Sequence, residues 1–429
     1  MRVLMFGWEF PPHIAGGLGT ACKGIVEGLA HNGVETLFVM PSASGDEDQS
    51  CTTILNASDV AVEYVSETVD EFLDKVRFIN VDSNIVPYVD PDEYFEAIER
   101  MKKNKMTETT IGFGQKFKFS GKYGANLLEE VSRYAQVGGT IALQHKGEFD
   151  VIHAHDWLTY LAGIAAKELT GKPLVVHVHA TSFDRGTDDM VDTRVYAIEK
   201  RGMEAADKVV AVSELTRNIV INKYGINPDK VVAVHNAVDF SGRENLEVQR
   251  GVKDKIVTFL GRITFQKGPE YFIDAAAKVL KRTDGVRFVM AGSGDMMNRA
   301  IRQVAKLGIS DRFHFTGFLR GADVQKMFAL SDVYIMPSVS EPFGISPLEA
   351  MRSNVPSIIS FQSGAAEILR YAFKVNFWDV DAMADDIYAL IKYPALADFA
   401  AKHGYDEVNA LKWDHAAAKL KDIYYSLTK

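Results

Sequence analysis

The sequence predicts an α/β fold made of two Rossmann-like domains, each built on a parallel sheet. The chain has 429 residues, which is too long for one ordinary hydrophobic core. Short runs of β-branched and apolar residues alternate with helical patterns, as in repeated βαβ units. A polar stretch, residues 239–254, separates two series of such runs. We therefore expect an N-terminal domain over 1–242, a C-terminal domain over 243–410 and a final helix within 411–429.

The strands follow from the apolar runs of each series. The first series predicts strands at 3–6, 36–40, 151–153, 174–178, 208–212 and 231–234, and the second at 256–260, 288–291, 313–315, 333–336 and 357–360. An insertion at about 81–147 interrupts the first series, and insertions of this length are usually functional or mobile. Ala416, Leu420, Ile423 and Leu427 have helical spacing, which predicts the final helix.

The composition excludes several classes of protein. Apolar residues make up 47% of the chain and charged residues 24%, which is typical of soluble globular proteins. The net charge of -9 argues against nucleic acid as the main partner. No stretch of about 18 apolar residues occurs, so we expect no transmembrane segment. The apolar N-terminus is too short for a signal peptide, and two cysteines give no disulfide framework, so we expect a cytoplasmic protein.

Two pairs of charged residues in the second half point to chemistry. Arg262 and Lys267 flank a turn after a predicted strand, where a guanidinium fork and an ammonium group suit a diphosphate. Glu341 and Glu349 lie eight residues apart across a strand-to-helix turn and could hold hydroxyl groups. Each has an ordinary alternative. The cations could be solvated surface charges. Glu349 could instead complete a capping box with Ser346, which the local pattern favours.

The first half offers weaker signals. Gly16 and Gly17 lie between the first predicted strand and a helix, where backbone amides could approach a phosphate or simply form a tight turn. His153 and His155 share one face of a strand, but no third metal ligand is evident nearby, so we expect a structural function and no metal. His177 and His179 also share a face. One of these two is expected to be packed, and the other could project into a cleft.

These motifs together resemble a known family. Residues 341–349 resemble the E-x7-E motif of retaining glycosyltransferases with the two-domain B-type fold, and 261–268 resemble their G-R-x4-K-G segment. Gly16-Gly17 resembles their N-terminal glycine loop, and 151–157 is similar to glycogen and starch synthases and their close relatives. The resemblance spans the chain from Met1 to Trp413. It implies that the domains face a central cleft and that the final helix crosses back to the N-terminal domain.

The resemblance also implies site residues. The cations would neutralise the donor diphosphate, while the carboxylates would contact the sugar hydroxyls and the ribose. Backbone amides after the E-x7-E glutamate would bind phosphate. On this basis the catalytic positions are His179, Arg262, Lys267 and Glu341, the donor-binding positions are Gly16, Gly17, Gly344, Ile345 and Glu349, and the acceptor-side position is Asp156.

The implied activity is the retaining transfer of a hexose, glucose first, from a nucleoside-diphosphate sugar to a carbohydrate or other hydroxyl acceptor, without a metal or other cofactor. Ile14 stands where bacterial glycogen synthases carry lysine, so a hexosyltransferase with a non-glucan acceptor is the alternative. A sugar-nucleotide epimerase and a non-catalytic sugar-nucleotide binder are further rivals. Aromatic residues of the insertion could stack on an acceptor sugar or pack onto their own domain; they are Phe113, Phe117, Phe119 and Tyr123.

Overall fold

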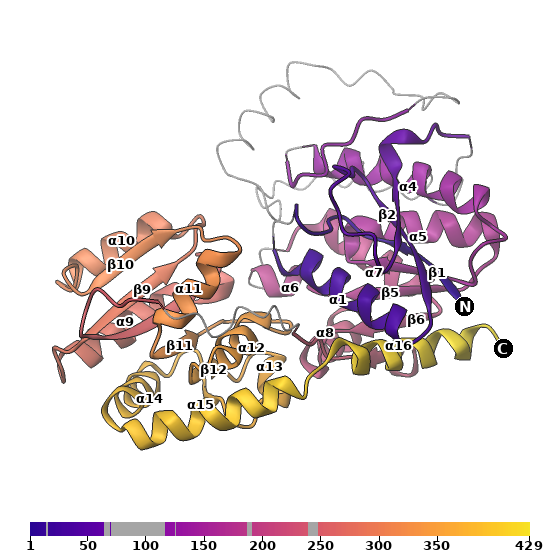
Figure 1. The fold of residues 1–429 in the computed structure, drawn as a ribbon. Helices are drawn as coiled ribbons and strands as arrows, with labels where there is room; N and C mark the ends of the chain where they lie inside the picture. Colours follow the sequence, from indigo (N-terminus) through magenta and orange to yellow (C-terminus); the bar gives the residue numbers. More distant parts are fainter. Residues whose placement is uncertain (14–15, 64–68, 70–115, 125, 187–190, 239–247) are drawn as a thin grey trace, which may run out of the picture. The chain divides into compact units, whose positions relative to one another are not determined.

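The computed structural model describes residues 1–13, 16–63, 69, 116–124, 126–186, 191–238 and 248–429. They divide into two compact units (Figure 1). Unit 1 contains residues 1–236 together with 413–429, and unit 2 contains residues 237–412. The division falls slightly before the expected boundary at 242. Most of the predicted insertion, residues 81–115 and 125, and most of the predicted linker, residues 239–247, lie outside the described residues.

Unit 1 is a parallel sheet with helices on both faces. Its described strands run in the order β3-β2-β1-β4-β5-β6-β7, so the strand order reverses beside β1. The strands are β1 (Arg2–Phe6), β2 (Glu35–Met40), β3 (Thr53–Asn56), β4 (Val151–His155), β5 (Leu174–Val178), β6 (Lys208–Ala211) and β7 (Val231–Ala233). The helices are α1 (Gly17–His31), α4 (Leu127–Gln144), α5 (Trp157–Thr170), α6 (Ser182–Arg185), α7 (Thr193–Ala205), α8 (Glu214–Tyr224) and α16 (Trp413–Leu427). Every residue of β4 and β5 is buried, as expected for central strands of a parallel sheet covered on both faces.

Unit 2 repeats the same plan. Its described strands run in the order β10-β9-β8-β11-β12-β13, with the reversal beside β8. They are β8 (Lys255–Leu260), β9 (Val286–Ala291), β10 (Phe313–Gly317), β11 (Val333–Met336), β12 (Ser357–Ser360) and β13 (Phe373–Val375). The helices are α9 (Pro269–Leu280), α10 (Met297–Lys306), α11 (Ala322–Leu330), α12 (Ile345–Arg352), α13 (Ala365–Ile368), α14 (Val380–Lys392) and α15 (Pro394–Asn409). The α/β prediction of two Rossmann-like sheets is confirmed.

The eleven predicted strands all coincide with observed ones, but β3 and β13 were missed. Both are edge strands. β3 has the sequence TILN and no buried residue, so it lacks an apolar run. β13 has only three residues. An edge strand is held by one neighbour and needs less apolar surface, so its sequence signal is weak.

The final helix packs within unit 1. α16 lies along α1, and glycines of α1 make room for it. A Cβ atom on Gly24 would lie 2.2 Å from the Trp413 ring, and one on Gly28 would lie 2.7 Å from the Trp413 carbonyl oxygen. Helices approach this closely only where one of them carries no side chain. Tyr424 of α16 is thereby buried against the sheet, where its hydroxyl is hydrogen-bonded to His153.

The described aromatic residues of the insertion pack onto their own unit. Phe119 is 4% exposed and belongs to the core, with its ring edge-on to Tyr134. Phe117 packs against the same core beneath Arg133, and Tyr123 also borders it. Of the two alternatives, packing onto their own domain is the one seen for these rings: it is complete for Phe119 and partial for Phe117 and Tyr123. Phe113 lies outside the described residues.

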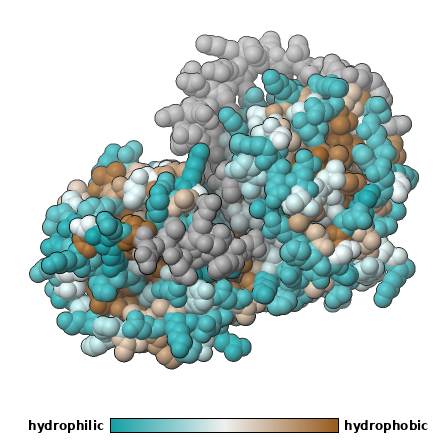
Figure 2. All heavy atoms as spheres, viewed as in Figure 1, coloured by the Kyte–Doolittle hydropathy of each residue, from teal (hydrophilic) through white to brown (hydrophobic). Residues whose placement is uncertain are grey.

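Polar residues cover most of the face drawn in Figure 2, and hydrophobic residues gather there only in small groups. Among the described helices, none combines the length and the apolar character that a membrane span requires.

Candidate active site

The charged candidate residues of unit 2 follow two neighbouring strands, three of them in the connecting segments and Glu349 within helix α12. Arg262 and Lys267 follow β8, while Glu341 and Glu349 follow β11, which pairs with β8. In open α/β sheets, ligands bind beyond the carboxyl ends of the strands where the strand order reverses. The β8–β11 pair forms that reversal in unit 2, so the fold brings the two predicted charge pairs to one edge.

The loop after β8 is held tightly against the loop after β11. Gly268 has φ 65°, and a Cβ atom there would lie 2.2 Å from the Pro337 carbonyl oxygen, so only glycine fits. The Val339 amide donates a hydrogen bond to the Gln266 carbonyl oxygen at 2.8 Å. The Arg262 guanidinium donates through Nη2 to Gln266 Oε1 at 3.2 Å. These contacts set both cations in fixed positions beside the second loop.

Lys267 and Glu341 form an ion pair. Their side chains are only 18% and 10% exposed, so solvent screens the pair weakly. The Ser338 hydroxyl donates to the same carboxylate oxygen at 3.3 Å. The Glu341 amide also donates to the Gln362 carbonyl oxygen at 2.9 Å, which fixes the backbone. Unit 2 therefore unites one of the predicted cations with one of the predicted carboxylates.

Helix α12 begins two residues earlier than a capping box of Ser346 and Glu349 would require. Its N-cap is Gly344, with φ 96°, and Ile345 is its first residue. Ser346 lies inside the helix, where its hydroxyl accepts a hydrogen bond from Tyr334 at 2.9 Å. The expected capping box between Ser346 and Glu349 is therefore wrong. Within the described residues the Glu349 carboxylate has no hydrogen bond, and burial raises its pKa.

In unit 1, the glycine loop leads directly into α1. Gly16 and Gly17 are exposed at the start of this helix. The Gly19 amide is already engaged, because it donates to Glu9 Oε1 at 3.0 Å, and Glu9 is 4% exposed. Sequence reasoning missed Glu9, although its place directly after β1 could have indicated it. A ligand phosphate at this helix end would meet the remaining amides next to a buried carboxylate.

Asp156 adopts a strained backbone conformation at the end of β4. Its φ of 58° and ψ of 168° fall in a region that is almost restricted to glycine. One carboxylate oxygen accepts hydrogen bonds from the amides of His179 at 2.7 Å and Ala180 at 3.3 Å. Burial raises the pKa of Asp156 to about 7, opposed by Arg185 and by these two amides. Asp156 thus positions the segment that carries His179, and its acceptor-side function stays a prediction.

His179 is partly exposed, and His155 orients its ring. His179 Nε2 lies 2.9 Å from His155 Nδ1, so one of the two nitrogens donates to the other. Burial lowers the pKa of His179 to about 3, which keeps the ring neutral near pH 7. A neutral imidazole can exchange hydrogen bonds with a hydroxyl group but brings no positive charge.

Two family models match adjoining parts of the chain. The model described as "Glycosyl transferases group 1" matches residues 243–406, and "Glycosyltransferase Family 4" matches residues 122–241. The chain is a glycosyltransferase.

Relatives and solved structures agree with this assignment over the whole chain. This glycosyltransferase is 28% identical to an uncharacterized glycosyltransferase of Methanocaldococcus jannaschii, covering 99% of the chain and 98% of the relative. It is 22% identical to a glycogen synthase of Mycobacterium tuberculosis, covering 99% and 94%. Its fold is similar to that of sucrose-phosphate synthase from Thermosynechococcus elongatus, with TM-score 0.68, 17% identity and coverage of 99% and 98%. It is also similar to Anabaena HepE, solved in complex with UDP and glucose, with TM-score 0.66, 18% identity and full coverage of both chains.

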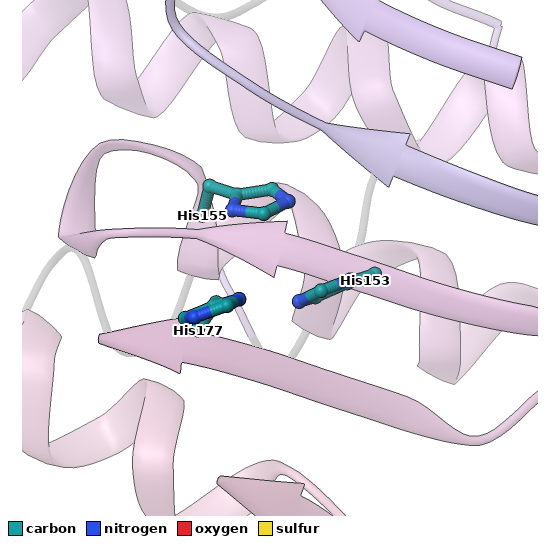
Figure 3. A group of neighbouring side chains, drawn as sticks. All are labelled: His153, His155 and His177. Atoms are coloured by element: carbon teal, nitrogen blue, oxygen red, sulfur yellow. The ribbon is translucent and has the colours of Figure 1, made fainter. Parts of the chain in front are cut away.

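One feature of the glycosyltransferase differs from the sequence expectation. His153 and His155 were expected to lack a third partner, but β5 places His177 directly opposite His155 in the sheet register. The three rings form a buried block near the end of β4 (Figure 3). The register between two strands far apart in the sequence creates this group, and no local pattern reveals it.

Proposed function

We propose that this glycosyltransferase is a retaining hexosyltransferase that moves glucose from a nucleoside-diphosphate sugar to a hydroxyl acceptor in the cytoplasm. The observation that carries the proposal is the weakly exposed Lys267–Glu341 ion pair, set in loops beside Arg262 and the start of α12. Acceptor-side contacts are assigned to Asp156, and contacts with the donor sugar to His179.

The unit 2 loops offer the charges that a sugar diphosphate needs. Lys267 and the guanidinium fork of Arg262 are suited to phosphate oxygens. The amides of Gly344 and Ile345 begin α12, and helix N-termini favour anions. As the bond to the sugar breaks, negative charge grows on the leaving diphosphate, and preorganised cations stabilise that charge. We therefore assign no metal to the transfer step.

The carboxylates would hold the other parts of the donor. When a diphosphate binds Lys267, Glu341 shares its cation and can accept hydrogen bonds from sugar hydroxyls. Within the described residues the hydrogen bonds of Glu349 go to its backbone, from Ser353, so its carboxylate is available to a ribose hydroxyl. The glucose assignment is supported by the glycogen synthase relative and by the structural neighbour that holds UDP and glucose.

A second acceptor class has its own support. The chain is 25% identical, over 71% of its length, to a D-inositol 3-phosphate glycosyltransferase of Nocardioides sp.. In addition, Ile14 replaces the lysine of bacterial glycogen synthases. The alternative is therefore the same transfer to a small hydroxyl compound instead of a glucan.

The test starts with the donor. Nucleotide sugars with ADP, UDP and GDP are compared by thermal shift, and the best donor is then offered with glucans and with small polyols. We expect acceptor-dependent release of the nucleoside diphosphate, and an α-linked product from an α-linked donor in the proton NMR spectrum. A β-linked product would refute retention. Conversion of the donor sugar in the absence of acceptor would instead indicate an epimerase.

A further inference from the structure

The buried block of His153, His155 and His177 has the geometry of a small ligand set. His153 and His155 alternate along β4 and so share one face, and His177 lies beside them on β5. The ring centroids are 4.3 Å apart for His153 and His155, 5.3 Å for His153 and His177, and 5.2 Å for His155 and His177. All three side chains are at most 1% exposed. Figure 3 shows the rings gathered from both strands.

The hydrogen bonds of the block divide its nitrogens into two kinds. His153 Nδ1 is hydrogen-bonded to the Tyr424 hydroxyl at 2.6 Å, and His155 Nδ1 to His179 Nε2 at 2.9 Å. Within the described part of the chain, the Nε2 atoms of both rings and both nitrogens of His177 have no partner. A buried polar atom without a partner costs about 1–3 kcal/mol, so four together require an explanation.

We propose that His153, His155 and His177 bind one divalent transition-metal ion. Each residue offers a nitrogen, and these three atoms lie within 4.8 Å of one another. Histidine ligands usually hydrogen-bond through the nitrogen that faces away from the metal, which is the pattern of His153 and His155. Nitrogens around a tetrahedral ion at ~2.1 Å lie about 3.4 Å apart, so small ring rotations would bring the three nitrogens to ligand spacing, with a water molecule as the fourth ligand.

The three histidine ligands determine which class of metal ion can bind. Three neutral imidazoles suit Zn²⁺, Co²⁺, Ni²⁺ or Cu²⁺, while Mg²⁺ and Ca²⁺ prefer the oxygen ligands that this set lacks. The ion would tie β4 and β5 to α16 through Tyr424. It would also reach His179 through the hydrogen bond from His155. The function is structural, and it does not depend on the proposed transfer reaction.

The test measures metal bound during folding. The full chain, without a histidine tag, is expressed in medium supplied with CoCl₂ and purified without chelator. We expect about one cobalt per chain by elemental analysis, with the visible absorption of tetrahedral Co²⁺. His177→Asn should abolish both signals. Tyr424→Phe keeps all three ligands and should weaken binding roughly tenfold or more, as loss of such outer hydrogen bonds does elsewhere.

Exposed histidines provide the matched control. His415→Gln, on α16 itself, should retain the full cobalt content. Wild-type protein with less than about a tenth of an equivalent of any transition metal would overturn the proposal and leave buried water as the partner of these nitrogens. Equal loss of cobalt in His415→Gln and His177→Asn would also overturn it, because the ion would then be bound at the surface. If His177→Asn does not fold, the proposal is still tested by the cobalt content of the wild-type protein and by the weaker cobalt binding expected of Tyr424→Phe.

Discussion

Lys267 forms an ion pair with Glu341 and is also proposed to bind the donor, and the effects of these two contacts can be measured separately. Lys267→Ala leaves the Glu341 carboxylate, with a side chain 10% exposed, without its cation. We expect a loss of roughly 1–3 kcal/mol in the free energy of unfolding. Turnover should fall by about a hundredfold or more through loss of phosphate stabilisation. Urea denaturation and initial rates measure the two effects independently.

The double variant Lys267→Ala/Glu341→Gln separates the loss of stability from the loss of turnover. A neutral glutamine needs no counterion, so most of the lost stability should return while turnover stays low. Arg262→Ala removes the hydrogen bond to Gln266 and leaves the Lys267–Glu341 ion pair in place, so it should cut turnover similarly with a smaller change in stability. Lys281→Ala, an exposed cation at the end of α9, serves as the control. Recovery of turnover in the double variant would remove Lys267 from the proposed diphosphate site.

Glu349 can be tested without disturbing its helix. Since it does not cap α12, Glu349→Gln should leave the melting temperature unchanged or slightly raised, because a buried charge is removed. If the carboxylate binds ribose, the affinity for the nucleoside diphosphate should fall by about tenfold, a loss typical of one charged hydrogen bond. Isothermal titration measures this affinity, with the exposed Glu367→Gln as control. Unchanged affinity would exclude the ribose contact.

At the scale of single residues, the sequence shows which side chains are available but not which of them meet. Arg262, Lys267 and Glu341 could be singled out because their motifs are local and rich in glycine and proline. The ion pair between Lys267 and Glu341 depends on the pairing of β8 with β11. At Ser346 the local pattern predicted a contact that the structure does not form. Its pattern fits a cap, but Gly344 adopts the left-handed conformation first and so begins the helix.

At the scale of elements, α14 carries an acid that opposes folding at neutral pH. Burial, and then the neighbouring Asp385 and Asp379, raise the pKa of Asp386 to about 6. The ordinary pKa of an aspartate is 3.8, so the folded state binds the proton more tightly than the unfolded chain does. Stability therefore falls as the pH rises from about 4 to about 6 and stays reduced above that range. Below it both states are protonated, and the penalty disappears.

Asp386→Asn should remove this penalty. We expect a gain of roughly 1 kcal/mol at pH 7, after allowance for partial solvent screening, and almost none at pH 4. Urea denaturation at both pH values measures the difference. Asp398→Asn, on the exposed side of α15, should show no such pH dependence. A gain at pH 4 equal to that at pH 7 would mean that helix propensity, and not the charge, is responsible.

Elements were predictable in proportion to how fully they are buried. β4 and β5 are buried along their whole length and appear in the sequence as apolar runs. β3 and β13 lie at the edges of their sheets, and their few buried atoms leave no run to detect. The rings of Phe117 and Phe119 were ambiguous for the same reason. Their alternation with lysine fits either a half-buried strand or an exposed loop, and only the packing on Tyr134 decides.

At the scale of the whole molecule, two sheets could be predicted because each βαβ series is continuous in sequence. Contacts that join distant segments could not. Tyr424 meets His153 across 271 positions of the chain, and His177 meets His155 through strand register. Such contacts leave no local pattern, because each partner alone is an ordinary buried residue. The buried histidine block, which carries the metal proposal, is of this kind.

The last prediction concerns metals in the reaction as a whole. If Arg262, Lys267 and the α12 amides stabilise the leaving diphosphate, transfer needs no Mg²⁺ or Mn²⁺. Initial rates should therefore persist after EDTA treatment and exhaustive dialysis, and neither ion should raise them. Removal of an ion from the histidine block should lower the melting temperature and leave the initial rate at 25 °C intact, because that ion is structural.

A loss of activity that Mg²⁺ or Mn²⁺ restores would refute the cation-based mechanism, since these hard ions bind phosphate and carboxylate oxygens rather than three imidazoles. A loss that only Zn²⁺ or Co²⁺ restores, in parallel with the melting temperature, would instead show that the block holds His179 in its active position.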